Sequence, residues 1–155
     1  MSQLEIGQEA PDFTLPQDGG DPVTLSALRG GPVVLYFYPR DDTSGCTKEA
    51  IAFTGLAEDF AAAGATVFGI SKDTVEKHAK FRAKHELGVP LLSDAEGDVC
   101  EQFGVWVEKK MYGKVFMGIE RATVLIDANG KIAQVWRKVK VPGHAEAVLE
   151  AVRGL

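Results

Sequence analysis

The segment with the most evident chemical potential centres on Cys46, which lies between an apolar run at 32–38 and the rest of a helical pattern at 46–63. Thr43 or Ser44 suits the N-cap of that helix, which places Cys46 in its first turn. Unpaired backbone N–H groups and the positive end of the helix dipole favour a thiolate there. Because the thiolate is the nucleophilic form of cysteine, the sequence predicts a reactive thiol. The alternative is an inert, buried cysteine at a helix start.

The elements that position this segment are predicted from hydrophobic patterns. The run at 32–38 is continuous and rich in β-branched and aromatic residues, which is typical of a buried central strand. Asn129-Gly130 joins two apolar runs and predicts a hairpin. The other predicted elements are a hairpin at 12–25, a strand at 66–70, a helix at 71–86, an extended segment at 90–92, a helical turn at 98–103, the strands at 123–127 and 132–136, and a helix at 144–153.

This order of elements predicts an α/β protein with a thioredoxin-like fold, in which a mixed central sheet carries helices on both faces and an added N-terminal β-hairpin. Sites in open α/β sheets favour the carboxyl ends of strands, and the segment that leads to Cys46 follows such an end. The chain shows no linker-like change of composition and no internal repeat, so we expect a single domain over residues 1–155.

The composition argues against several classes of function. Lys and Arg total 17 against 22 Asp and Glu, and the resulting net charge of −5 disfavours nucleic acid as a partner. The sequence has neither an apolar run of about 18 residues nor a signal-like start, so we expect no membrane association and a cytoplasmic protein. Two cysteines are too few for a disulfide framework or a four-ligand zinc site. No glycine-rich phosphate loop is present either, so we expect no metal and no cofactor.

Several segments resemble the peroxiredoxin family. The pattern Pro39-x-x-x-Thr43-x-x-Cys46 is similar to the peroxiredoxin active-site motif, and Arg121 stands where that family carries its catalytic arginine. The wider stretch around the motif looks like the peroxiredoxin Q branch, also called bacterioferritin comigratory protein. The resemblance covers nearly the whole chain, and its segments are residues 7–13, 38–50 and 117–123.

The resemblance implies an antioxidant thiol-dependent peroxidase that reduces hydrogen peroxide and organic hydroperoxides through a sulfenic acid on Cys46. It also implies roles for three other side chains. The Thr43 hydroxyl would accept a hydrogen bond from the peroxide and donate one to the thiolate. Arg121 would supply a fixed positive charge, although a solvated surface arginine is the alternative. Pro39 would shield the sulfur without offering a competing donor.

A peroxide-sensing redox switch that uses the same sulfenic acid is the alternative function. The two functions differ in turnover, because an enzyme consumes peroxide over many cycles whereas a sensor consumes one equivalent. A dithiol oxidoreductase is disfavoured, because the sequence has no Cys-x-x-Cys pair.

The route by which the sulfenic acid is recycled is less evident from the sequence. Ile51 occupies a position where the family commonly carries a second, resolving cysteine, and a variant position around 81–83 has no cysteine either. Cys100 is therefore either a structural core residue or an unusual resolving residue. We expect reduction by an external thiol such as thioredoxin or glutaredoxin/glutathione. Resemblance to the branch also implies a monomer.

Three further groups of residues receive interpretations unrelated to catalysis. The histidines lack metal-ligand spacing and are interpreted as solvated or capping residues: His78, His85 and His144. An aromatic and methionine cluster is interpreted as core packing, with a peroxide-entry groove as the alternative: Trp106, Met111, Tyr112, Phe116 and Met117. Two basic stretches are interpreted as solvated charges of loops and an edge strand: Lys109, Lys110 and Lys114, and Arg137, Lys138 and Lys140.

Overall fold

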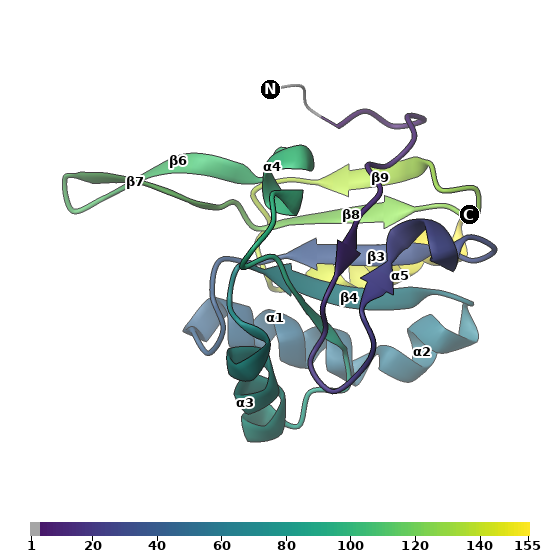
Figure 1. The fold of residues 1–155 in the computed structure, drawn as a ribbon. Coiled ribbons are helices and arrows are strands. Elements are labelled where there is room, and N and C mark those ends of the chain that lie inside the picture. The colour runs from purple at the N-terminus through teal and green to yellow at the C-terminus, as the bar shows by residue number, and fades with distance from the viewer. Residues whose placement is uncertain (1–3) are drawn as a thin grey trace.

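A computed structural model describes residues 4–155 and is built on one five-stranded sheet in the order β5-β4-β3-β8-β9 (Figure 1). The central strand pairs in parallel with β4 on one side and antiparallel with β8 on the other. The sheet is therefore mixed, as predicted. Its strands are β3 (Val33–Phe37), β4 (Thr66–Ser71), β5 (Leu91–Ser93), β8 (Ala122–Ile126) and β9 (Ile132–Trp136).

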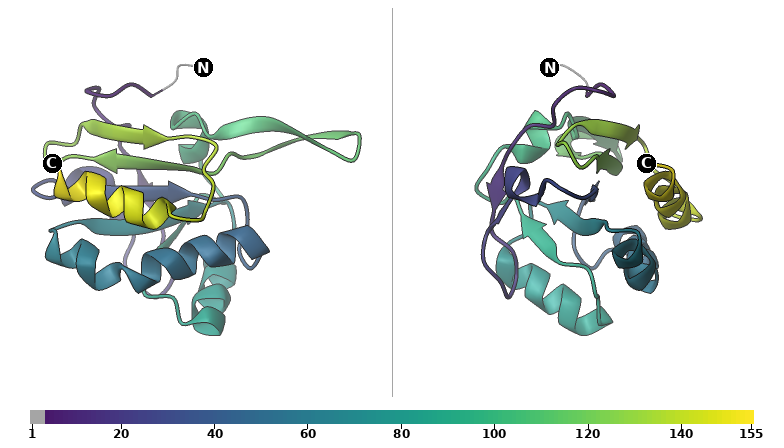
Figure 2. Two further views of the ribbon diagram at one scale, coloured as in Figure 1. Left: turned by 180° about the vertical axis from the view of Figure 1, so that it is seen from behind. Right: turned by 90° about the vertical axis from the view of Figure 1, so that its right-hand side faces the viewer.

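Both faces of the sheet are covered, which confirms the thioredoxin-like α/β arrangement. The helices α1 (Ser44–Gly55), α2 (Ala57–Ala62) and α5 (His144–Arg153) lie together on one face (Figure 2). The other face is covered by α4 (Val99–Gln102) and by the predicted N-terminal hairpin of β1 (Thr14–Leu15) and β2 (Val23–Thr24). A 3-10 helix at Leu25–Leu28 follows that hairpin.

Alternation along β3 divides the apolar core into two clusters. Val33, Leu35 and Phe37 belong to the cluster under the N-terminal hairpin and α4. Val34 and Tyr36 belong to the cluster under α1, α2 and α5. Because successive side chains of a strand point to opposite faces, a buried strand of this kind must be apolar at every position, as the sequence showed.

Two predicted helices differ from the observed ones. The helix predicted over 46–63 is interrupted at Leu56, which has φ −107° and ψ 9°, directly after Gly55. Glycine is a poor helix former and lets α1 end there. Helix α3 (Val75–His85) begins four residues later than expected, because Ser71 completes β4 and the Thr74 side chain accepts the capping bond from Lys77 N at 3.2 Å.

The hairpin of β6 (Trp106–Met111) and β7 (Lys114–Ile119) was not predicted from the sequence, and it projects from the body of the molecule (Figure 1). Its turn, Tyr112-Gly113, has positive φ at both positions, as tight hairpins require. Because the ribbon projects, its large apolar side chains are exposed: Met111, Tyr112, Val115, Phe116 and Met117. The core-packing interpretation of this cluster was therefore wrong, apart from the partly buried Trp106.

The described part of the chain contains no helix long and apolar enough to cross a membrane.

Candidate active site

Cys46 lies in the first turn of α1, directly beyond the carboxyl end of β3, and its side chain is only 1% exposed. Thr43 is the N-cap residue, with extended φ and ψ, as the sequence predicted. Its hydroxyl does not cap the helix, however, because it donates to the Arg40 carbonyl at 2.9 Å. The backbone thus places the sulfur at the helix start without help from the capping side chain.

Arg121 is brought to Cys46 by the pairing of two strands. Antiparallel β8 begins opposite the end of β3, since Ala122 pairs with Phe37, so residue 121 lies beside the segment that leads into α1. The guanidinium Nη2 donates to Cys46 Sγ at 3.4 Å. A Cβ on Gly45 would come within 3.0 Å of the same Nη2, so the glycine leaves room for this approach. The alternative of a solvated surface arginine is therefore wrong.

Glu49 is a member of the site that was not predicted from the sequence. It lies one turn after Cys46 on the same face of α1, is 1% exposed, and accepts from Arg121 Nη1 at 2.8 Å. Its Oε2 has no hydrogen-bond partner among residues 4–155. Burial raises the pKa of Glu49 to about 7, although the Arg121 charge opposes that shift. The spacing of Glu49 from Cys46 was the only available sign in the sequence.

Pro39 lines a groove of about 430 Å³ whose far wall is the β6–β7 hairpin. Trp106, Phe116 and Met117 supply apolar surface there, and Lys109 supplies positive charge. Three members of the aromatic and methionine cluster thus line a groove beside Pro39, as the alternative interpretation proposed, whereas Met111 and Tyr112 lie outside its lining.

Comparison with known proteins agrees with this geometry. The model of the AhpC/TSA family matches residues 6–135. The chain belongs to the AhpC/TSA family. The enzyme is similar to Peroxiredoxin Bcp of Bacillus subtilis, with 48% identity over 98% of this chain and 97% of the relative. The protein is therefore a peroxiredoxin, which is a thiol-dependent peroxidase. Its reaction takes a peroxide substrate and a thiol reductant.

Two solved structures resemble this peroxiredoxin over almost its whole length. One is the bacterioferritin comigratory protein of Xanthomonas campestris, with 45% identity, a TM-score of 0.89, and 97% and 96% of the two chains covered. The other is a PrxQ mutant of Xylella fastidiosa, with 40% identity, a TM-score of 0.93, and 99% and 98% covered.

Cys100 lies far from the thiol of this peroxiredoxin in the fold. It is fully buried in the core cluster under α4, whereas Cys46 belongs to the cluster on the opposite face of the sheet. Its backbone N–H donates to the buried Asp94 at 2.8 Å. Burial, reinforced by the Asp94 charge, raises the pKa of the Cys100 thiol well above its usual range. Both cysteines are free thiols in this structure.

Two of the three histidines of this peroxiredoxin are buried, so interpreting them as solvated or capping residues was wrong. His78 belongs to α3 and is fully buried, and its Nδ1 is hydrogen-bonded to Asp41. His144 Nε2 lies 2.8 Å from Thr123 Oγ1, and burial together with Arg121 lowers the pKa of His144 to about 4. His85, on the outer part of α3, binds Asp42 at 2.9 Å. His144 is buried by the rings of Phe53 and Trp136, and His78 is buried against the Leu92 carbonyl. These neighbours lie on other elements of the fold, so the sequence does not reveal them.

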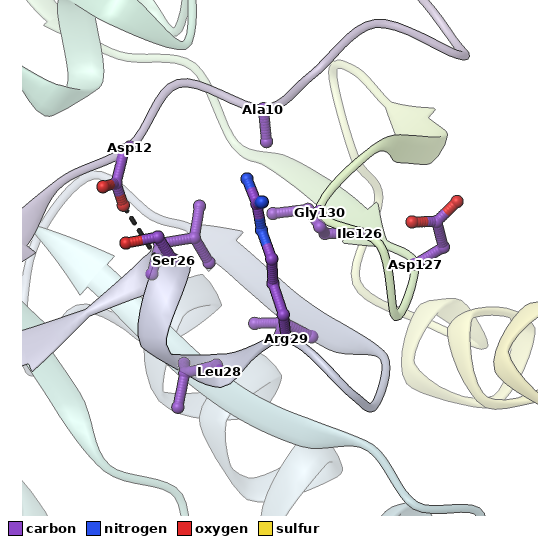
Figure 3. A pocket seen from close by; sticks show the side chains of 10 residues that line it. Ala10, Asp12, Ser26, Leu28, Arg29, Ile126, Asp127 and Gly130 are labelled. Carbon is purple, nitrogen blue, oxygen red and sulfur yellow. Dashed lines mark hydrogen bonds between the residues drawn. The ribbon is translucent and has the colours of Figure 1, made fainter.

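A second cavity of this peroxiredoxin lies at the opposite end of β3 and β8 from Cys46 (Figure 3). The Arg29 side chain extends across it beside Gly130, and Asp12 accepts from the backbone of Ser26 at 2.8 Å. Its volume of about 10 Å³ is close to the space of one water molecule, so it cannot hold a peroxide substrate.

Proposed function

We propose that this enzyme reduces hydrogen peroxide and organic hydroperoxides at Cys46. The thiolate attacks the protonated oxygen of the peroxide, and the O–O bond breaks. The proton of the attacked oxygen passes to the second oxygen, which leaves as water or an alcohol, and the sulfenate formed on Cys46 takes up a proton from solvent to become a sulfenic acid. The observation that carries this proposal is the 3.4 Å contact between Arg121 Nη2 and Cys46 Sγ. A cation there stabilises both the thiolate and the negative charge that builds on the oxygens.

The orientation of Arg121 is fixed by a second hydrogen bond. Its other terminal nitrogen, Nη1, donates to Glu49 Oε1 at 2.8 Å, so the guanidinium plane is fixed while Nη2 faces the sulfur. We assign Glu49 as the residue that orients Arg121, because a charge-assisted bond to a buried carboxylate restricts the arginine rotamers.

Thr43 and Pro39 complete the proposed site. The Thr43 hydroxyl proton is engaged by the Arg40 carbonyl, so the Thr43 oxygen is left to accept from the peroxide O–H. Donation from Thr43 to the thiolate would require this bond to break. Pro39, which has no N–H, borders the groove and offers no donor that competes for the peroxide. The backbone N–H of Cys46 is the remaining donor we assign to the site.

The groove supports organic hydroperoxides as well as hydrogen peroxide. Phe116 and Met117 present apolar surface beside Pro39, which suits the hydrocarbon part of an alkyl hydroperoxide. The Xanthomonas campestris relative is described by its alkyl peroxide reduction activity. We extend that substrate class to this enzyme.

We further propose that an external thiol, such as thioredoxin or glutaredoxin/glutathione, reduces the Cys46 sulfenic acid. Cys100 lies on the other face of the sheet, so a disulfide with Cys46 would need the core to open. A chain of 155 residues with two cysteines differs from disulfide-rich secreted domains, which supports the cytoplasm as the location. We also propose that the protein is a single domain, that it is a monomer and that it has no nucleic-acid partner. Sedimentation measures the oligomeric state, and self-association through the exposed β6–β7 hairpin would contradict the monomer.

The proposed function is tested by counting turnovers. The wild-type protein is mixed with excess peroxide and excess dithiol, and peroxide consumption is followed for many equivalents. We expect continuous turnover that disappears in Cys46→Ser and persists in Cys100→Ser. Consumption of a single equivalent, followed by a stable sulfenic acid in excess thiol, would favour the redox-switch alternative.

A further inference from the structure

His78 occupies a fully buried position between the loop before α1 and the strand β5. Its Nε2 lies 3.0 Å from the Leu92 carbonyl, and its Nδ1 lies 2.7 Å from Asp41 Oδ2. A carbonyl oxygen only accepts, so Nε2 carries a proton. The second proton of the network lies between Nδ1 and Asp41, which are hydrogen-bonded whichever of the two holds it.

Both carboxylate oxygens and the backbone N–H of Asp41 are hydrogen-bonded, and two of the three partners, His78 and Asp73, are distant in the sequence. Its Oδ1 accepts from the Tyr38 hydroxyl at 2.5 Å, its Oδ2 meets His78, and its backbone N–H donates to Asp73 Oδ2 at 2.7 Å. Burial, with the Asp41 charge, raises the pKa of Tyr38 well above its ordinary value, so the phenol remains a donor. Asp41 is therefore a fixed point of the backbone between β3 and α1.

That fixed point lies in the middle of the residues we assign to peroxide binding. Asp41 is two residues after Pro39 and two residues before Thr43, in a segment without helix or strand. The next residue, Asp42, has φ +60° and is itself held by α3, through Lys84 at 2.7 Å and His85 at 2.9 Å. Side chains of α3 thus bind two consecutive residues, Asp41 and Asp42, in the loop that leads to Cys46.

We propose that His78 is a positioning residue of the peroxidase site, which acts through Asp41 on the backbone that carries Pro39 and Thr43. This inference rests on the proposed function, because it assigns His78 to the geometry of that site. Catalytic groups displaced by about 1 Å can lose up to about 100-fold in rate, so a relaxed loop slows the reaction of Cys46 even when the fold survives.

Two amide variants separate the two bonds of the imidazole. The amide of asparagine lies at the distance of Nδ1 from the backbone, so His78→Asn keeps a donor for Asp41 and loses the bond to Leu92. The amide of glutamine lies at the distance of Nε2, so His78→Gln keeps the bond to Leu92 and loses the donor for Asp41. Each variant loses one buried bond, so a purely structural role predicts comparable losses of stability and of rate in both.

The experiment measures the second-order rate of Cys46 oxidation by hydrogen peroxide, together with urea unfolding, for both variants. We expect His78→Gln to react 10- to 100-fold more slowly than wild type, and His78→Asn to react within about threefold of wild type. Equal rates in the two variants, or a slower His78→Asn, would overturn the proposal. Asp41→Asn should be slow as well, and adding His78→Gln to it should cost no further rate.

A second readout separates failure of this inference from failure of the proposed function. Alkylation of Cys46 by iodoacetamide reports on the same thiol without any peroxide. If wild type does not reduce peroxide, the proposed function fails, and the alkylation rates still decide the role of His78. If wild type reduces peroxide and His78→Gln matches it in both reactions, only the positioning role fails.

Discussion

Glu49 offers the most quantitative test of the site, because the structure places a carboxylate where an ionised form is costly. Its pKa rises from an ordinary 4.5 to about 7 in the fold, chiefly through burial and in spite of Arg121. A group whose folded pKa is raised stabilises the fold at low pH, and that stabilisation is lost as the pH rises through the folded value. Glu49→Gln removes this dependence while keeping the shape of the side chain.

The size of the effect on stability follows from the rise of about 2.5 in the pKa of Glu49. This rise corresponds to a cost of at most about 3 kcal/mol for burying the ionised carboxylate. At about pH 5 only a small part of this cost is present, roughly 1 kcal/mol, because the folded carboxyl is still protonated. At about pH 8 nearly all of it is present. The stability of Glu49→Gln relative to its parent should therefore rise by about 2 kcal/mol between these two conditions.

The assay is urea unfolding at several pH values in a Cys46→Ser background, where no thiolate beside Arg121 complicates the titration. Glu150→Gln is the matched control, because Glu150 lies on the exposed side of α5 and pairs with Arg153 at 3.1 Å. Its pH curve should stay parallel to that of the parent. Parallel curves for Glu49→Gln, or a relative loss of stability towards pH 8, would refute a buried carboxylate of raised pKa.

Three other predictions follow from neighbouring contacts. Arg121→Ala should slow the peroxide oxidation of Cys46 by about 100- to 1000-fold in stopped-flow measurements, and a wild-type rate would show that another cation supports the thiolate. His144, with a pKa lowered to about 4 by burial and Arg121, binds a proton more readily when unfolded, so the stability of His144→Gln relative to wild type should rise as the pH falls from about 6.5 to 4, by at most about 3 kcal/mol. Thermal melts of both proteins across this range measure the difference, and parallel curves would contradict a lowered pKa of His144. Cys100→Ser should keep full turnover with an external thiol, whereas a quantitative Cys46–Cys100 disulfide in oxidised wild type would make Cys100 the resolving residue.

The sheet and the nucleophile were predictable because they depend on local signals. The apolar run of β3, rich in β-branched and aromatic residues, is typical of a buried strand, and the position of Cys46 at a helix start follows from the residues beside it. Arg121 was identified from resemblance, and the pairing of β8 with β3 supplies the physical reason for its place.

The remaining features depend on contacts between distant segments. Glu49 looks like any acidic residue on a helix surface until Arg121, which is 72 residues later, covers it. His78 likewise looks solvated until Asp41 and the Leu92 carbonyl meet it from two other segments. The β6–β7 hairpin was missed for a different reason. Apart from the ends at Trp106 and Ile119 it projects into solvent, so its strands lack the apolar alternation that a half-buried strand shows.

The central claim is that peroxide oxidises the sulfur of Cys46. Intact-mass analysis after one equivalent of hydrogen peroxide tests this claim most directly. With a sulfenic-acid trap present, wild type and Cys100→Ser should both carry the trap on the peptide that contains Cys46, and Cys46→Ser should carry none. Trapping at any other residue, or unchanged peroxide consumption in Cys46→Ser, would contradict the account.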